Sequence, residues 1–376
     1  MRARDLGLRI GLGQPGPLNA ITDVSGARVG HETIVESTDV RTGVTVILPH
    51  EGDPGSDPVF AGCHRLNGNG ELTGLEWVRE SGFLTTPIGL TNTHSVGVVR
   101  DALIEWAVDG GLMTDDQWSL PVVGETYDGT LNDINGLHVR KEHVFRAIEA
   151  ASTGAVAEGG VGSGTGMICH GFKGGIGTAS RVLAEADGGY VVGVLVQANH
   201  GVRERLVIEG VRIGEAIPHE RVPVAGVWGL PTDATASPAG LPTQGRPRPP
   251  RGGSIIIVVA TDAPLLPHQC ERLAQRAGLG VARIGGAGEN GSGDIFIAFS
   301  TGNRGLSGGG AHAVTMLGNE SIDPLFYATI EATEEAIVNS LVAAETMTGK
   351  DGATAHRLDH NLLLETLARG SPAPSG

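Results

Sequence analysis

The feature that most constrains this chain is an abrupt junction, at which RPRPPRGG (residues 246–253) runs directly into SIIIVVA (residues 254–260). The second segment is apolar on both alternating faces, which predicts a central strand that is covered on both sides. Such a strand should begin inside the protein. The residues before it, however, have the composition of an exposed linker: over 229–253 hydrophobic periodicity disappears, and Pro, Gly, Thr and Ala dominate. A buried strand therefore has to start beside a segment that is poorly suited to folding.

The linker and the serine after it each allow two interpretations. Residues 229–253 could simply join two domains, but a loop this long is unusual inside a compact domain and is often functional or disordered. Ser254 could be an ordinary serine with satisfied hydrogen bonds. It could equally be a reactive nucleophile at the start of the strand. Gly-Ser pairs are common, so the residues alone leave both possibilities open.

One chemistry requires this arrangement. In self-cleaving N-terminal nucleophile enzymes, a serine hydroxyl attacks the preceding carbonyl, forms an ester and releases the upstream segment by hydrolysis. The new chain end carries the nucleophile together with an α-amine, whose ordinary pKa of about 7.7–8.0 suits a general base near neutrality. No histidine is then needed. Gly253 suits the cleaved bond because it has no Cβ to block the attack.

Composition excludes several classes of function. The 376 residues carry 42 acidic and 27 basic side chains, and we find no basic footprint of the kind that nucleic-acid binding needs. No run of about 18 apolar residues predicts a membrane span, and the first residues lack the apolar core of a signal peptide. Cys63, Cys169 and Cys270 are scattered without a CxxC motif, which predicts reduced thiols in a cytoplasmic protein with no bound metal.

Short apolar runs bounded by Gly, Pro or Asn predict strands over residues 43–48, 87–91, 190–196, 254–260 and 294–300. Helices are predicted over residues 100–108, 267–277 and 323–348. For the last helix we expect Asp323 as N-cap, Pro324 at the first position and Gly349 as C-cap. Strands and helices do not alternate simply, so we expect a layered α+β fold rather than a βαβ repeat.

A second glycine-rich stretch contains a formal GxGxxG from Gly286 to Gly291. A dinucleotide site would require a helix after it, but a strand follows, so we reject that interpretation. Ser292 and Asp294 lie two residues apart at the head of this strand, and their side chains share a face. Such a pair could orient an α-ammonium group and relay its proton. A turn in which both residues bond backbone amides is the alternative.

Three more polar residues are candidates for the site. The amide of Asn199, after the strand at 190–196, offers two donors that could stabilise an oxyanion. Glu125 and Tyr127 are again two residues apart, and could offer a carboxylate to a substrate ammonium and a phenol to a developing oxyanion. Plain turns remain possible for all three.

Eight stretches in order resemble the L-aminopeptidase D-amidase/D-esterase (DmpA-type) family, which includes the β-peptidyl aminopeptidases. They are GPLNAITDVSGARVGH, GVTVILPH, NGNGELTGLEW, TNTHSVGVVRDA, ETYDGTLNDING, VQANHG, GGSIIIVVATDAPLLPHQCERLAQRA and NGSGDIFIAFSTGN. The resemblance covers nearly the whole chain. It implies a four-layer αββα sandwich like that of the N-terminal nucleophile hydrolases, with different connectivity.

The resemblance also implies roles for individual residues. Self-cleavage between Gly253 and Ser254 would give an α chain (1–253) and a β chain (254–376) within one structural domain. Ser254 would be the nucleophile, Ser292 and Asp294 the serine–acid pair, and Asn199 the oxyanion donor. The remaining assignments are Tyr127, which would assist Asn199, and Glu125 and Trp118, which match substrate-pocket positions. No cofactor is implied, and the expected assembly is a tetramer of αβ pairs.

We therefore expect an aminopeptidase that releases N-terminal residues from short peptides, amides or esters through an acyl-enzyme on Ser254. A free amino group on the substrate should be required. An amidase acting on non-peptide oligoamides or β-peptides by the same mechanism is the first alternative. An inactive relative that only binds its ligand is the second, although Ser254, Ser292, Asp294 and Asn199 are all present.

Overall fold

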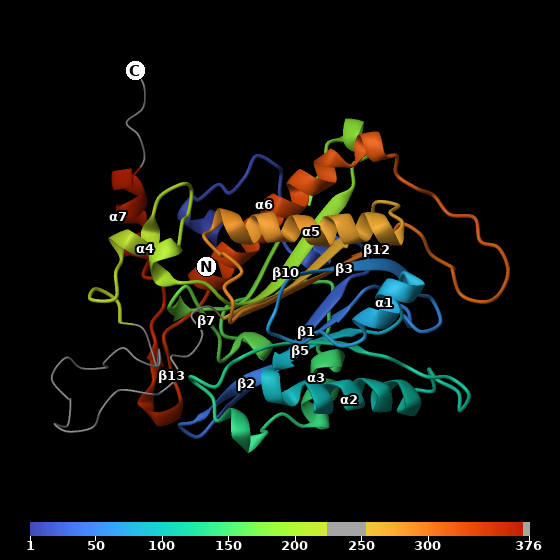
Figure 1. The fold of residues 1–376 in the computed structure, drawn as a ribbon, viewed down its shortest axis with the longest axis horizontal. Coiled ribbons are helices and arrows are strands. Elements are labelled where there is room, and N and C mark those ends of the chain that lie inside the picture. The colour runs from blue at the N-terminus through green and yellow to red at the C-terminus, as the bar shows by residue number, and fades with distance from the viewer. Residues whose placement is uncertain (224–252, 371–376) are drawn as a thin grey trace.

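The computed structural model describes residues 1–223 and 253–370. Two β-sheets lie face to face, and helices cover the outer face of each, so the layers run helix, sheet, sheet, helix (Figure 1). This confirms the four-layer αββα architecture and the α+β class. Most of the linker predicted at 229–253 lies outside the described residues. None of the described helices is long and apolar enough to cross a membrane.

The larger sheet contains six strands in the order β4-β3-β12-β11-β10-β9. Its strands β11 and β12 are parallel, and the other neighbours are antiparallel. Their bounds are β4 (Phe83–Leu84), β3 (Val59–Gly68), β12 (Gly293–Ser300), β11 (Ser254–Thr261), β10 (Val191–Asn199) and β9 (Gly175–Val182). The strand that starts at Ser254 is therefore central, between strands from both sides of the junction.

The smaller sheet has four strands in the order β1-β2-β5-β6, of which β5 and β6 are parallel. They are β1 (Arg28–Glu36), β2 (Val40–Leu48), β5 (Ile88–Asn92) and β6 (Val122–Thr126). Helices α2 (Val96–Asp109) and α3 (Lys141–Glu149) cover this sheet, whereas α5 (Pro267–Arg283) and α6 (Asp323–Val342) cover the larger one (Figure 1). The shorter elements are α1 (Leu75–Ser81), α4 (Ile213–Ala216), α7 (His360–Gly370), β7 (Ile168–Cys169), β8 (Phe172–Lys173), β13 (Met347–Thr348) and β14 (Thr354–Ala355).

Strand β11 explains why its sequence is apolar at every position after the serine. Ile255 and Ile257 belong to the core between the larger sheet and helices α5 and α6. Ile256 and Val258 belong to the core between the two sheets. All eight residues of the strand are buried, which confirms the prediction of a strand covered on both sides.

The C-terminal end predicted for the last long helix is wrong. Helix α6 ends at Val342, and its N-cap is Ile322 rather than Asp323. Residues Met347–Thr348 instead form the short strand β13, which pairs with β14. Gly349 is not a C-cap: its φ of −137° is extended, and a side chain there would overlap the carbonyl oxygen of Leu131. A close approach between backbones requires this glycine, and strand pairing overrides the helical pattern.

The other predicted elements exist with shifted ends. Helix α5 continues to Arg283 rather than ending at residue 277, and α2 begins at Val96, four residues before the predicted start. Strand β10 continues to Asn199, so this residue ends the strand rather than following it. That extension matters for the site, because it brings Asn199 into register with Ser254.

Candidate active site

Ser254 lies at the start of β11, between the ends of two neighbouring strands. It pairs with Asn199 of β10, and the next residue, Ile255, pairs with Asp294 of β12. The Ser254 side chain is buried, and its Oγ accepts a hydrogen bond of 3.0 Å from the backbone N–H of Gly293. Strand pairing therefore brings together four of the predicted residues: Ser254, Asn199, Ser292 and Asp294.

The position before Ser254 has room only for glycine. A Cβ built on Gly253 would overlap the backbone carbonyl oxygen of Asn199, and it would lie 3.2 Å from the Asn199 side-chain nitrogen. The Asn199 backbone cannot move away to make room for a Cβ without breaking its pairing with Ser254 in the sheet. Gly253 thus lets the main chain pass close enough to Asn199 for the Asn199 amide to reach this peptide.

The Asn199 amide is held in one orientation. Its Oδ1 accepts a 2.8 Å bond from the Ile168 backbone N–H, and its Nδ2 donates a 3.0 Å bond to the Tyr127 carbonyl oxygen. An amide nitrogen has two hydrogens. In the described part of the chain we find no acceptor for the second, so it remains available to a carbonyl oxygen at the Gly253–Ser254 junction. A free amide N–H is the kind of donor that oxyanion stabilisation uses.

Ser292 and Asp294 form a direct pair, as their spacing predicts. The Ser292 hydroxyl lies 2.8 Å from Asp294 Oδ2, and both side chains are buried. Burial raises the pKa of the Asp294 carboxyl to about 6; the nearby Glu289 charge also raises it, while the Ser292 hydroxyl and the Ile255 backbone N–H lower it. Asp294 Oδ1 is buried and has no hydrogen-bond partner among the residues described. This oxygen belongs to a residue that pairs with Ile255, the residue directly after Ser254.

The raised pKa of Asp294 predicts a pH-dependent stability in the uncut chain. Because the usual carboxyl pKa of 3.8 rises to about 6, the folded state binds the proton more tightly than the unfolded state. The stabilisation from this proton is present in full below pH 4 and is lost as the pH rises through the window to about 6. The expected loss is on the order of 3 kcal/mol.

Urea unfolding at several pH values measures this effect. We expect the Ser254→Ala chain to lose more stability between pH 4 and pH 6.5 than the Ser254→Ala/Asp294→Asn chain. Both chains share every other titrating group, so the difference isolates Asp294. Parallel stability curves for the two chains would show that Asp294 does not titrate in this range.

Glu125 is a buried carboxylate near the same strand ends. Its Oε1 accepts a 2.9 Å bond from the Glu71 backbone N–H, and its Oε2 accepts a bond from the Thr93 hydroxyl. Burial raises the pKa of Glu125, although these two hydrogen bonds counteract the effect. A Cβ built on Gly70 would lie 3.2 Å from Glu125 Oε1 and 2.9 Å from the Gly293 Cα. In space, only Gly70 therefore lies between Glu125 and Gly293, whose N–H donates to Ser254.

The structure places the two aromatic candidates at the surface. The Tyr127 side chain is 49% exposed, and only its backbone carbonyl contacts Asn199. Trp118 is 61% exposed and packs edge-to-face on Trp77 with ring centroids 4.9 Å apart. Neither ring forms a hydrogen bond to the other candidates within the described ranges. Their roles remain predictions.

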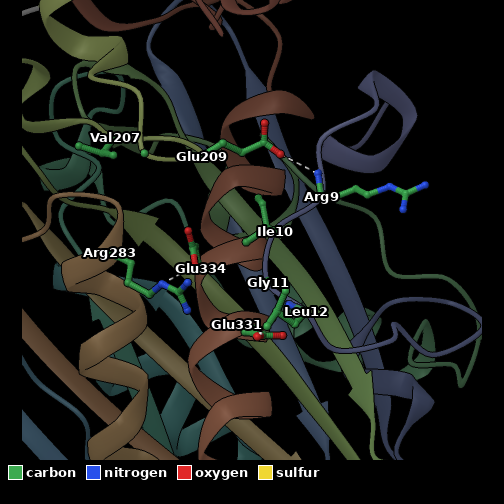
Figure 2. A pocket seen from close by; sticks show the side chains of 10 residues that line it. Arg9, Ile10, Gly11, Leu12, Val207, Glu209, Arg283, Glu331 and Glu334 are labelled. Carbon is green, nitrogen blue, oxygen red and sulfur yellow. Dashed lines mark hydrogen bonds and ion pairs between the residues drawn. The ribbon is translucent and has the colours of Figure 1, made fainter. Parts of the chain in front are cut away.

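A pocket of about 410 Å³ lies beside the site. The residues that line it include Gly70, Trp77, Leu120 and Ile295. Trp118 therefore packs against one wall of this pocket rather than lining it. A larger pocket of about 550 Å³ is elsewhere, between the N-terminal segment and α6, and is lined by charged side chains that include Arg9, Glu209, Arg283 and Glu334 (Figure 2). None of the candidate active-site residues lines either of these two pockets.

Among the residues described, one cluster has the composition of a metal site. Potential ligand atoms of Cys169, His170 and His200 lie within 4.8 Å of one another, and all three side chains are buried. Burial raises the pKa of the Cys169 thiol to about 12, and burial together with the buried Arg203 guanidinium lowers the pKa of His170. A protonated thiol is a poor metal ligand, and a positive charge this near opposes a divalent cation, so the cluster does not fit such a metal.

Several residues that shape the site escaped the sequence-based prediction. They are Asn67, Gly70, Thr93 and Gly293, which bond or border Ser292, Glu125 and Ser254. Asn67 and Gly70 belong to the NGNGELTGLEW stretch, one of the eight that carry the family resemblance. Its dense Asn and Gly content is a signal of close backbone approach that could have singled it out.

Comparison with known proteins finds similarity over most of the chain. The model of peptidase family S58 matches residues 19–355. The chain is 50% identical to the β-peptidyl aminopeptidase BapA of Sphingosinicella microcystinivorans, over 96% of this chain and 90% of that protein. A β-aminopeptidase structure from Burkholderia sp. has 53% identity and a TM-score of 0.89, with 100% of both chains covered.

A third relative connects the fold to a known class. The L-aminopeptidase D-Ala-esterase/amidase of Ochrobactrum anthropi is 43% identical, with a TM-score of 0.85 over 98% of both chains. That protein is described as a prototype of the serine aminopeptidases and as a new variant of the Ntn hydrolase fold. The likeness confirms the fold that the sequence resemblance implied.

Proposed function

The chain belongs to peptidase family S58, and on that premise we propose that it is a serine aminopeptidase that activates itself by cutting the Gly253–Ser254 bond. The observation that carries the proposal is the position of Ser254. A buried serine at the head of a central strand directly follows a position where only glycine fits, and it lies in register with a free amide donor of Asn199. An ordinary structural serine requires none of these features.

Self-cleavage would begin with attack of the Ser254 Oγ on the Gly253 carbonyl carbon. The Asn199 Nδ2 supports this step, since its second hydrogen can stabilise the negative charge on the carbonyl oxygen. The Gly253–Ser254 C–N bond breaks, an ester forms, and the nitrogen of Ser254 takes up the proton from the hydroxyl. Water then hydrolyses the ester, which leaves a carboxylate on Gly253 and restores the Ser254 hydroxyl.

The same residues would then act on a substrate. The new α-amine of Ser254 accepts the hydroxyl proton while Oγ attacks the substrate carbonyl, and Asn199 again stabilises the oxyanion. The proton passes to the leaving amine, and water releases the N-terminal residue from the acyl-enzyme. The Ser292–Asp294 pair supports this cycle, because the unpaired Asp294 Oδ1 can hold the α-amine in place between proton transfers.

The substrate we propose is a short peptide, amide or ester with a free N-terminal amino group. The buried Glu125 carboxylate lies one glycine away from Gly293 and would hold that group as an ammonium ion. Among such substrates we favour β-peptides, because two of the relatives are a β-peptidyl aminopeptidase and a β-aminopeptidase with 50% and 53% identity. Non-peptide oligoamides remain the alternative substrate class.

We also propose the organisation that the resemblance implies. The α chain would comprise residues 1–253 and the β chain residues 254–376, and four αβ pairs would assemble into a tetramer. The central position of β11 supports continued association after the cut, since β11 pairs with β10 of the α chain along its length. Chain separation would expose a fully buried strand.

Replacing Glu125 tests how the substrate is held. For Glu125→Gln we expect kcat/KM on substrates with a free amino group to fall by an amount equivalent to about 2–5 kcal/mol, because a buried ion pair loses one partner. This corresponds to roughly 30-fold to several thousand-fold. Activity on N-acetylated analogues, which lack the ammonium ion, should already be near background in the unmodified enzyme.

A panel of α-peptide amides, β-dipeptides and aminohexanoate oligomers, each with and without an N-acetyl group, makes the measurement. Glu80→Gln is the matched control, because Glu80 is an exposed carboxylate on the nearby helix α1 and does not line the pocket beside the site. Its kinetics should match those of the unmodified enzyme. Equal turnover of free and acetylated substrates would contradict recognition of an amino group.

A further inference from the structure

One peptide unit joins the serine–acid pair to the nucleophile. Its N–H belongs to Gly293 and donates to Ser254 Oγ over 3.0 Å. Its carbonyl oxygen belongs to Ser292, the partner of Asp294. Since a peptide unit is planar and its N–H and C=O point in opposite directions, whatever holds the carbonyl oxygen also aims the N–H.

Two donors from the end of β3 hold this carbonyl oxygen. The side-chain Nδ2 of Asn67 donates to Ser292 O over 2.6 Å, and the backbone N–H of Asn69 donates to the same oxygen over 3.0 Å. Asn67 Nδ2 also donates to the Glu289 carbonyl oxygen over 2.7 Å. The turn from Glu289 to Ser292 is therefore fixed at both ends by one side chain.

We propose that Asn67 is a positioning residue for catalysis, which aims the Gly293 N–H at Ser254 Oγ and keeps Ser292 beside Asp294. Asn67 acts through the Ser292–Gly293 peptide and does not touch the substrate. The bonds to the Ser292 carbonyl also polarise this peptide, so they strengthen the N–H that binds the nucleophile oxygen. The inference rests on the proposed function, in which Ser254 is the nucleophile.

The burial of this network limits what could replace the Asn67 side chain. Ser292 and Asp294 are buried, whereas Asn67 is half-buried at the strand end, paired across the sheet with Asp294. Water could replace the lost donor only by entering this turn. Aspartate has nearly the same shape, but its carboxylate would place negative oxygen atoms against two carbonyl oxygens. The geometry requires a donor at this position rather than only a side chain of this volume.

The experiment compares Asn67→Ala and Asn67→Asp with the unmodified enzyme. We expect kcat to fall by about 10- to 100-fold in Asn67→Ala, in line with the loss of positioning at a reacting group. KM should change less than about twofold, since Glu125 is untouched. Asn67→Asp should lose at least as much kcat as Asn67→Ala. Self-cleavage should also slow, with Asn67→Asp affected at least as much as Asn67→Ala. Intact mass of freshly made protein, measured over time, gives its rate.

Asn339→Ala serves as the matched control. The Asn339 amide also bonds two backbone groups, Ala3 N and Thr178 O, but it lies on α6 away from the site. Its melting temperature should fall while kcat stays unchanged. An unaltered kcat in both Asn67 variants, or a rise in KM with kcat preserved, would overturn the inference. If Asn67→Ala does not fold, the isosteric Asn67→Asp supplies the same comparison.

The outcomes also separate this inference from the proposed function. If a Ser254→Ala chain turns over substrate, Ser254 is not the nucleophile and the proposed function is wrong, whatever the Asn67 variants do. An inert Ser254→Ala chain together with fully active Asn67 variants would overturn only the role of Asn67.

Discussion

Ser254→Ala should yield a single uncut chain of 38.6 kDa with no turnover above background. Removing the nucleophile of a serine peptidase lowers kcat by roughly a million-fold, and here the same hydroxyl would also make the chain cut. The substitution removes one acceptor for the Gly293 N–H, a cost of about 1 kcal/mol. The variant should therefore fold, so that loss of activity reports on chemistry and not on unfolding.

Ser340→Ala is the control for this experiment. Ser340 is also a buried serine with one backbone partner, the Ile337 carbonyl oxygen, but it lies on α6. It should be cut and active like the unmodified protein. If Ser254→Ala is cut normally, another residue must be the nucleophile.

Gly253→Ala should block or strongly slow self-cleavage, so that the uncut precursor accumulates. The added methyl group would overlap the Asn199 carbonyl oxygen, and the chain can relieve this clash only by moving residue 253 away from Asn199. A misplacement of about 1 Å at a reacting group can lower the rate about 100-fold. The fraction of uncut chain, measured by mass at successive times after synthesis, gives the rate.

Gly97→Ala provides the comparison for this second substitution. Gly97 lies in helix α2, and a Cβ there would have open space around it. Its precursor should disappear at the normal rate. Cleavage of Gly253→Ala as fast as that of Gly97→Ala would mean that the close approach to Asn199 plays no part in the reaction.

The sequence was sufficient to predict where the two central strands of the larger sheet begin. Ser254 and Asp294 each begin an apolar run that is easy to recognise, and buried runs of this kind must pair in the centre of a sheet. The Ser292–Asp294 contact follows from the two-residue period of a strand, which the structure confirms with a 2.8 Å bond. Local patterns were therefore enough where the contacting residues lie close together in the sequence, as Ser292 and Asp294 do.

Contacts between segments far apart in the chain could not be read from local patterns. The bonds from Asn67 to Ser292 and from Thr93 to Glu125 depend on which strands are neighbours and in which register. Neither property is contained in the spacing of residues along one segment. The end of α6 was missed for a related reason, because pairing of β13 with β14 competes with a helical pattern.

The intact mass of the purified, unmodified protein tests the central claim most directly. Self-cleavage predicts two polypeptides, residues 1–253 and residues 254–376, and end sequencing of the smaller one should give Ser-Ile-Ile-Ile. Both pieces should co-purify with the peptidase activity. A single chain of 38.6 kDa that is fully active would contradict the claim, because its Ser254 would have no free α-amine to act as the base.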